Sequence, residues 1–212
     1  MKLGHIEMFE SFDQTQYERR IKPMLAAYSG PKASFVLSDT AMWHYITMYD
    51  SIPAQRSSQP IQLLYFKDKE LVSYQLNCYA KGTPLGKLDW NYNNRFDTRI
   101  PKTAMDFSGD KIDLDQLLNT LNLPVADSIR SNKEVMVLFW TRVMWSQTYS
   151  LHDLMVRNAM QTGQKDLPAI IYVNTDKFFA QEMAGKNNVN GSDLGFLSEE
   201  QIEKVKGWAQ ME

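Results

Sequence analysis

The side chains with the most reactive chemistry are few and widely spaced in this 212-residue sequence. Cys78 is the single cysteine, so the chain alone can form neither an internal disulfide nor a cysteine-based zinc cluster. His5, His44 and His152 show neither HxxxH nor HxxE spacing. The sequence also contains no P-loop, GxGxxG or GxSxG motif. We therefore predict no metal site, no bound cofactor and no catalytic group that a motif identifies.

Cys78 lies in a segment whose apolar residues alternate. Val72, Tyr74, Leu76 and Cys78 fall on one face of a strand predicted over residues 71–80. This position predicts a buried thiol. An alternative hypothesis is an enzyme with a dispersed site, in which a distant histidine activates Cys78.

A second candidate region is the irregular loop at residues 81–111. It is rich in Gly, Pro and Asn, yet it contains the aromatic stretch DWNYNNRF. Long loops in compact domains are often functional, and aromatic rings beside Arg and Asn suit a binding surface. The candidate binding residues are Trp90, Tyr92, Arg95 and Phe96. The alternative is that the rings only pin the loop to the body of the protein.

The elements that must position these residues follow from the apolar pattern. Runs at 61–66 and 71–79 across a short polar link predict a β-hairpin. Runs at 135–140 and 169–173, with an amphipathic helix at about 147–160 between them, predict a parallel βαβ unit. We expect the four strands to form one mixed β-sheet flanked by helices, in a single α/β or α+β domain over residues 1–212.

Further helices are expected around this sheet. Residues 12–28 read as a helix that contains Pro23, which predicts a kink or two short helices. Ser38 or Asp39 could cap the next helix, Asp113 caps another, and Ser198 with Gln201 fits a capping box at the start of the last.

Two segments resemble the thioredoxin-like family. In the first, residues 135–176, an apolar strand ends in Phe139-Trp140 and leads into a turn and a helix. In the family this turn carries a CxxC pair, whose two positions fall here on Met144 and Gln147. Neither residue can act as a thiol in disulfide exchange. The resemblance therefore implies a redox-inactive member, and we expect no dithiol oxidoreductase activity. The alternative is that Trp140, Met144 and Trp145 are ordinary core packing.

The second segment, residues 59–81, resembles the closing hairpin of the same family. A cis-proline precedes that hairpin in the family, and Pro60 is the matching candidate. Lys69 stands where the family's turn usually has Gly. In the family the hairpin follows the βαβ unit, whereas here it precedes it. Either the order of elements is rearranged or one of the two matches is accidental.

Composition narrows the range of partners. The formal net charge is −2 and the basic residues are scattered, which argues against nucleic-acid binding. The sequence has no apolar run long enough for a membrane span and no signal peptide at its start. These features suit a cytoplasmic protein, or a periplasmic or lipid-anchored one whose export signal has been removed. The resemblance to the thioredoxin-like family, rather than composition, implies a soluble, bacterial-type module that binds a protein partner or has a structural role. A cytoplasmic inhibitor is a further alternative.

Overall fold

A computed structural model describes residues 7–48, 59–76, 105–106, 111–161 and 166–183. The strands are β1 (Lys32–Val36), β2 (Gln62–Lys67), β3 (Glu70–Leu76), β4 (Met105–Asp106), β5 (Glu134–Trp140) and β6 (Ala169–Asn174). The helices are α1 (Gln14–Ala27), α2 (Asp39–Met48), α3 (Leu114–Thr120), α4 (Asp127–Arg130), α5 (Trp145–Gln161) and α6 (Asp176–Met183), with a 3-10 turn, η2, at Arg142–Met144.

The six strands form one mixed sheet in the order β1-β6-β5-β2-β3-β4. β1, β6 and β5 are parallel, and β2 pairs antiparallel with both β5 and β3. The prediction that the hairpin and the βαβ unit share one sheet is therefore confirmed, as is the α/β class with a mixed sheet flanked by helices.

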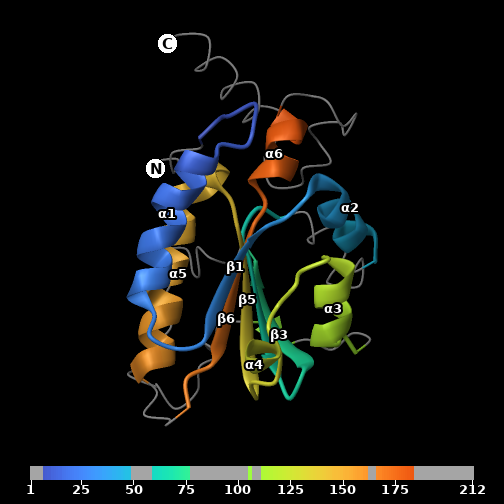
Figure 1. Ribbon diagram of the computed structural model, residues 1–212, viewed down its shortest axis with the longest axis vertical. Coiled ribbons are helices and arrows are strands. Elements are labelled where there is room, and N and C mark those ends of the chain that lie inside the picture. The colour runs from blue at the N-terminus through green and yellow to red at the C-terminus, as the bar shows by residue number, and fades with distance from the viewer. Residues whose placement is uncertain (1–6, 49–58, 77–104, 107–110, 162–165, 184–212) are drawn as a thin grey trace.

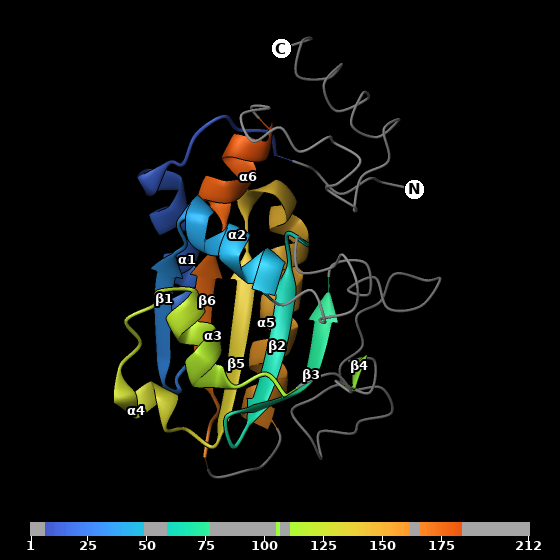
Figure 2. The same ribbon diagram turned by 90° about the vertical axis from the view of Figure 1, so that its right-hand side faces the viewer.

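Helices cover both faces of the sheet, which makes three layers (Figures 1 and 2). α1 and α5 pack on one face, and α2, α3 and α6 pack on the other. The central strands read as continuous apolar runs because both of their faces are buried. Within β5, Val137 and Phe139 point to the α2 side, whereas Met136 and Leu138 point to the α5 side.

Polar side chains begin the helices at positions that the sequence predicted. The Asp113 carboxylate accepts a hydrogen bond from the Gln116 backbone N–H at 3.0 Å, which caps α3. Of the two candidates for α2, Ser38 is the cap, since its hydroxyl accepts from the Ala41 N–H at 3.1 Å. The predicted cap at Ser198 lies outside the described residues.

Two local features differ from simple expectation. α1 runs through Pro23 as one helix, so the alternative of two short helices is wrong. The proline removes a single backbone donor, and the burial of Ile21 and Met24 holds the helix against the sheet. In the hairpin turn, Asp68 and Lys69 both adopt positive φ, 51° and 69°, although neither is glycine. None of the described helices is both long and apolar enough to cross a bilayer.

Candidate functional site

The carboxyl ends of the parallel strands meet at one edge of the sheet. β5 ends at Trp140 and is followed by Thr141 and Arg142, and β6 is followed by Thr175 and Asp176. Ligands of open α/β sheets usually bind at this edge. The edge also contains the β5–α5 turn, which the resemblance to the thioredoxin-like family matches to the turn that carries the CxxC pair in that family.

The two positions that match the dithiol lie at the start of α5. Met144 ends the η2 turn and packs against both hydrophobic cores. Gln147 lies in the first turn of α5, where its side-chain oxygen accepts a hydrogen bond from the Ser146 hydroxyl at 2.7 Å. The helix was predicted to begin near Gln147, and it begins at Trp145 instead. Neither side chain brings a thiol or another nucleophile to the turn.

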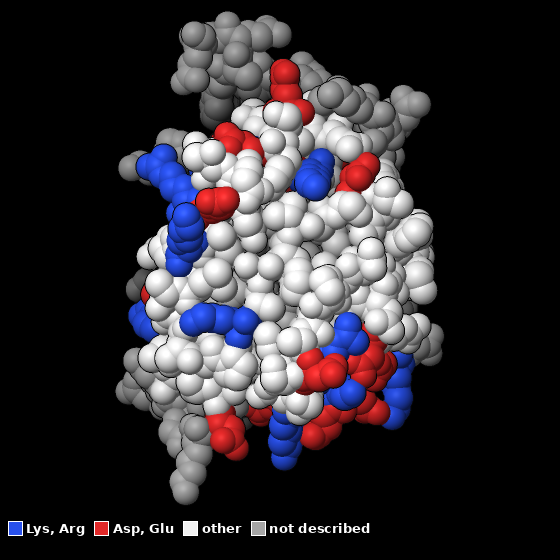
Figure 3. All heavy atoms as spheres, viewed as in Figure 1, with Lys and Arg blue, Asp and Glu red and all other residues white. Residues whose placement is uncertain are grey.

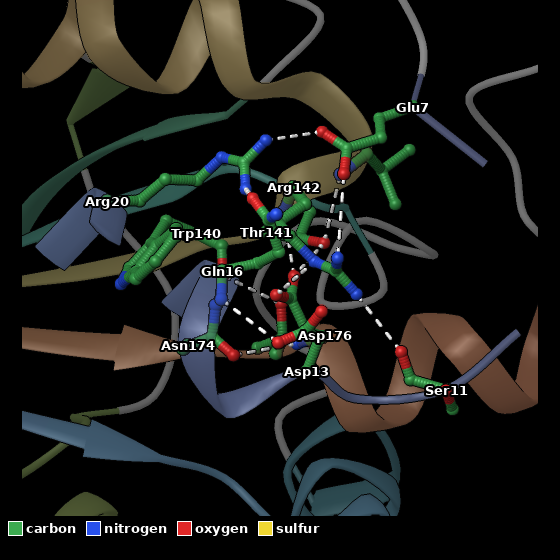
Figure 4. Close-up of polar contacts among 12 residues, drawn as sticks. Glu7, Ser11, Asp13, Gln16, Arg20, Trp140, Thr141, Arg142, Asn174 and Asp176 are labelled. Carbon is green, nitrogen blue, oxygen red and sulfur yellow. Dashed lines mark hydrogen bonds and ion pairs between the residues drawn. The ribbon is translucent and has the colours of Figure 1, made fainter. Parts of the chain in front are cut away.

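Asp176, the first residue of α6, fixes this turn. Its carboxylate is completely buried and accepts three hydrogen bonds from the residues after β5. The donors are the Thr141 hydroxyl at 2.8 Å, the Arg142 backbone N–H at 2.7 Å and the Arg142 Nε at 3.0 Å (Figure 4). A buried carboxylate is tolerated only when it is paired in this way. Asp176 therefore acts as a positioning residue that holds the β5–α5 turn against the start of α6.

Arg142 connects the turn to residues 7–13, which we call the N-terminal strap. The guanidinium donates to the Ser11 carbonyl at 3.0 Å and lies 3.9 Å from the centre of the Phe9 ring. The strap is also tied by its backbone, because the Glu7 N–H donates to the Val143 carbonyl at 3.1 Å. The side chain of Arg142 is only 5% exposed as a result.

Glu7 joins Arg142 to a second arginine, Arg20 of α1. One Glu7 oxygen lies 2.6 Å from Arg20 Nη2, and the other lies 3.5 Å from Arg142 Nη1 (Figure 4). Arg20 also donates to the Gln16 side chain at 2.7 Å and lies 5.3 Å from the centre of the Trp145 ring. Two cations and two carboxylates from four segments thus form one cluster, the carboxyl-edge cluster: Glu7, Arg20, Arg142 and Asp176.

The chemistry of this cluster suits anion binding and positioning. An arginine keeps its proton at any ordinary pH and presents a planar fork of donors to oxygen atoms. Both guanidinium groups are oriented by aromatic rings and by hydrogen bonds. The arrangement can therefore hold a carboxylate or similar oxyanion.

A second polar group is enclosed between α1, α5 and the sheet. His152 of α5 is 2% exposed, and its Nε2 lies 3.2 Å from the Tyr172 hydroxyl. Burial lowers the pKa of His152 to about 4, although a hydrogen bond with the Met24 backbone partly opposes this shift. Burial also raises the pKa of Tyr172. The imidazole is therefore neutral at physiological pH and serves as internal packing with satisfied polarity.

The structure also tests the packing alternative for three residues of the β5–α5 region and the predicted cis-proline. Trp140 is fully buried and stacks on Tyr17 at 5.8 Å, while Met144 and Trp145 are half-buried, in line with the packing alternative. The expected cis-proline at Pro60 is wrong, since the described residues contain no cis peptide bond. The trans form is the intrinsically favoured one, and Pro60 precedes β2 in that form.

Several predicted residues lie outside the described part of the chain. They are Cys78, Trp90, Tyr92, Arg95 and Phe96. Their roles as a buried thiol and as a binding surface therefore stay predictions. Of the two described histidines, His152 is buried and His44 is exposed on α2.

The members of the carboxyl-edge cluster were missed by sequence reasoning. A usable signal existed for two of them, because Arg142 and Asp176 come two and three residues after the predicted ends of two strands expected to be parallel neighbours. Glu7 and Arg20 carry no such signal, since nothing in the sequence shows that the strap crosses the ends of these strands.

A group of metal ligands or a known relative could give further evidence about this site. Within the described ranges, no three His, Cys, Asp or Glu side chains group closely enough to hold a metal ion. Comparisons with models of protein families, with curated proteins and with solved structures found no match to this chain.

Proposed function

We propose that this chain is a redox-inactive thioredoxin-like module that acts by binding another protein. The observation that carries the proposal is the β5–α5 turn. The resemblance matches this turn to the one that carries the family's dithiol, but here the turn contains Met144 and Gln147 and is held by the buried Asp176–Arg142 pair. A turn built in this way presents a fixed surface and no exchangeable thiol.

The arrangement of the sheet supports the relationship. An apolar strand ending in Phe139-Trp140 leads through α5 to a parallel strand, and an antiparallel hairpin pairs with that first strand. The resemblance implies both the βαβ unit and the hairpin, although here the hairpin comes earlier in the chain and Pro60 before it is trans. The hairpin precedes the βαβ unit along the chain, yet it lies beside the first strand of that unit in the same sheet.

The surface next to the turn supports binding. Tyr149 of α5 is 50% exposed, and its ring lies 5.8 Å from that of Trp145. Exposed aromatic rings contribute strongly to protein interfaces. Trp90, Tyr92, Arg95 and Phe96 stay predicted contributors to the same function.

Site-specific photo-crosslinking tests this proposal. A benzophenone amino acid in place of Tyr149 should give a discrete, larger adduct in cells that make the protein, and mass spectrometry should identify one recurrent partner. The matched control carries the same group in place of Lys111, whose side chain is 82% exposed at the opposite end of the sheet. Equal labelling at both positions, or no adduct at Tyr149, would contradict binding through this surface.

A further inference from the structure

Two arginines from different elements converge on one carboxylate at the carboxyl edge. Arg20 comes from α1 and Arg142 from the η2 turn, and both contact Glu7, at 2.6 and 3.5 Å. Their side chains are 14% and 5% exposed. Guanidinium groups that are desolvated and fixed in this way bind oxyanions more strongly than solvated ones, because less side-chain entropy is lost on binding.

One hydrogen-bond donor of Arg20 makes no contact with Glu7. The Nε of Arg20 is buried and has no hydrogen-bond partner among the described residues. Glu7 contacts Nη2 of the same guanidinium. Since Nε and Nη2 lie on one edge of the arginine fork, a ligand with two adjacent oxygens could satisfy both. A buried donor without a partner costs free energy, so such a ligand would gain an interaction that Glu7 does not make.

The two carboxylates of the cluster differ in how firmly they are held. Asp176 is completely buried and accepts three hydrogen bonds, two of them from Arg142. The Glu7 side chain is 36% exposed and comes from the strap. Removal of Glu7 would leave two guanidinium groups against one carboxylate, and therefore an excess positive charge in a largely desolvated place.

We propose that Arg20 and Arg142 form a binding site for the oxyanion of an external ligand, a carboxylate or a phosphate, and that Glu7 is an internal occupant which this ligand displaces. Bidentate contact with Nε and Nη2 of Arg20 anchors the ligand, while Arg142 supplies the second positive charge. The site goes beyond the proposed function, because it requires neither a relationship to thioredoxin nor a protein partner.

Anion rescue of a Glu7 variant in the full chain tests the site. The melting temperature of Glu7→Ala should rise by about 2–4 °C in sodium acetate or sodium phosphate, relative to sodium chloride of the same ionic strength, and the rise should saturate. A larger response to acetate assigns a carboxylate ligand, and a larger response to phosphate assigns a phosphoryl ligand. The wild-type protein should respond less, because Glu7 competes.

Two further variants serve as controls. Glu18→Ala removes the same charge from an exposed pair with Lys22, and it should show no anion-specific rise. Glu7→Ala/Arg20→Gln should lose the rise. The site would be rejected by an absent or unsaturable response in Glu7→Ala, by an equal response in Glu18→Ala, or by a response that persists without Arg20.

A direct measurement decides the question even if Glu7→Ala does not fold. In Glu7→Gln, which keeps the size of the side chain, the NMR signal of the Arg20 Nε–H should shift saturably as acetate or phosphate is added. An Arg20 Nε–H signal that does not move at concentrations up to several hundred millimolar, where adventitious ions would already associate, would overturn the proposal.

Discussion

The carboxyl edge of the sheet and the opposite end, where the β2–β3 turn lies, both carry ion pairs, but of different kinds. At the carboxyl edge, Arg142 and Asp176 are 3.0 Å apart and almost fully buried. At the opposite end, Lys111 and Glu70 are 2.6 Å apart, with side chains 82% and 55% exposed. Figure 3 shows acidic and basic side chains crowded together at the lower right of this face, whereas the charged side chains of its upper part are more widely separated.

The shorter ion pair is expected to matter less. In water, the attraction between two charges is screened and is offset by the entropy of holding long side chains in place. In the interior, breaking a pair leaves one charge without compensation in a poorly solvated place. Burial and hydrogen bonding, rather than distance, therefore decide which of these pairs contributes to stability.

The largest effect is expected from Asp176→Asn. The substitution keeps the shape of the side chain but leaves Arg142 buried without its main counter-charge, so the free energy of unfolding should fall by about 3–5 kcal/mol. Chemical denaturation at pH 7 measures this change. The double variant Asp176→Asn/Arg142→Met is the control, and it should lose less than the two single changes combined. A loss below about 1 kcal/mol for Asp176→Asn would remove the distinction between the two ends.

The second-largest expected effect is a loss of stability at low pH, which comes from the buried, uncharged side chain of His152. The pKa of His152 is about 4 in the folded protein, against roughly 6.5 when the chain is unfolded. Between these values the unfolded chain binds a proton that the folded protein does not. The contribution of neutral His152 to the free energy of unfolding should therefore be fully present above pH 6.5. The free energy of unfolding should decline by about 3 kcal/mol as the pH falls to 4.

Matched histidine variants isolate this contribution. His152→Gln should flatten the decline between pH 6.5 and 4, whereas His44→Gln on the exposed side of α2 should leave it unchanged. Unfolding free energies measured at several pH values provide the comparison. An unaltered pH profile in His152→Gln would show that the decline originates elsewhere.

The smallest effect is expected at the exposed end. The hydrogen bond from Lys111 to Glu70 raises the pKa of the lysine, yet the pair is open to solvent and to salt. Lys111→Ala should leave the denaturation midpoint unchanged within error at physiological ionic strength. A clear drop that disappears at 1 M salt would show that surface charges contribute more than this comparison allows.

The fold was more predictable from sequence than the candidate site. Runs such as 135–140 and 169–173 are apolar on both faces, so they predict buried strands whichever elements pack against them. The prediction that these strands share one sheet with the hairpin rested on the need for helices to cover both apolar faces. The helix boundaries were less accurate, because the η2 turn places Trp145 rather than Gln147 at the start of α5.

The carboxyl-edge cluster could not be predicted for a physical reason. Its contacts join segments that are far apart in sequence, such as Arg142 and Ser11, which are separated by 131 positions. No periodicity encodes such a contact, since it depends on where the strap crosses the sheet. The residue types were also uninformative, because Glu and Arg usually lie on solvated surfaces.

The order of the strands has a consequence for how the protein is made. On the ribosome, the β2–β3 hairpin emerges well before β5, its other partner, because Gln62 pairs with Phe139. β1 likewise waits for β6, with which Phe35 pairs through Val173. The nascent chain therefore carries apolar strands with unpaired edges until residues 134–174 have been synthesised, and such edges are sites of aggregation. Late arrival of the central strands favours slow folding and gives chaperones an extended period in which to bind.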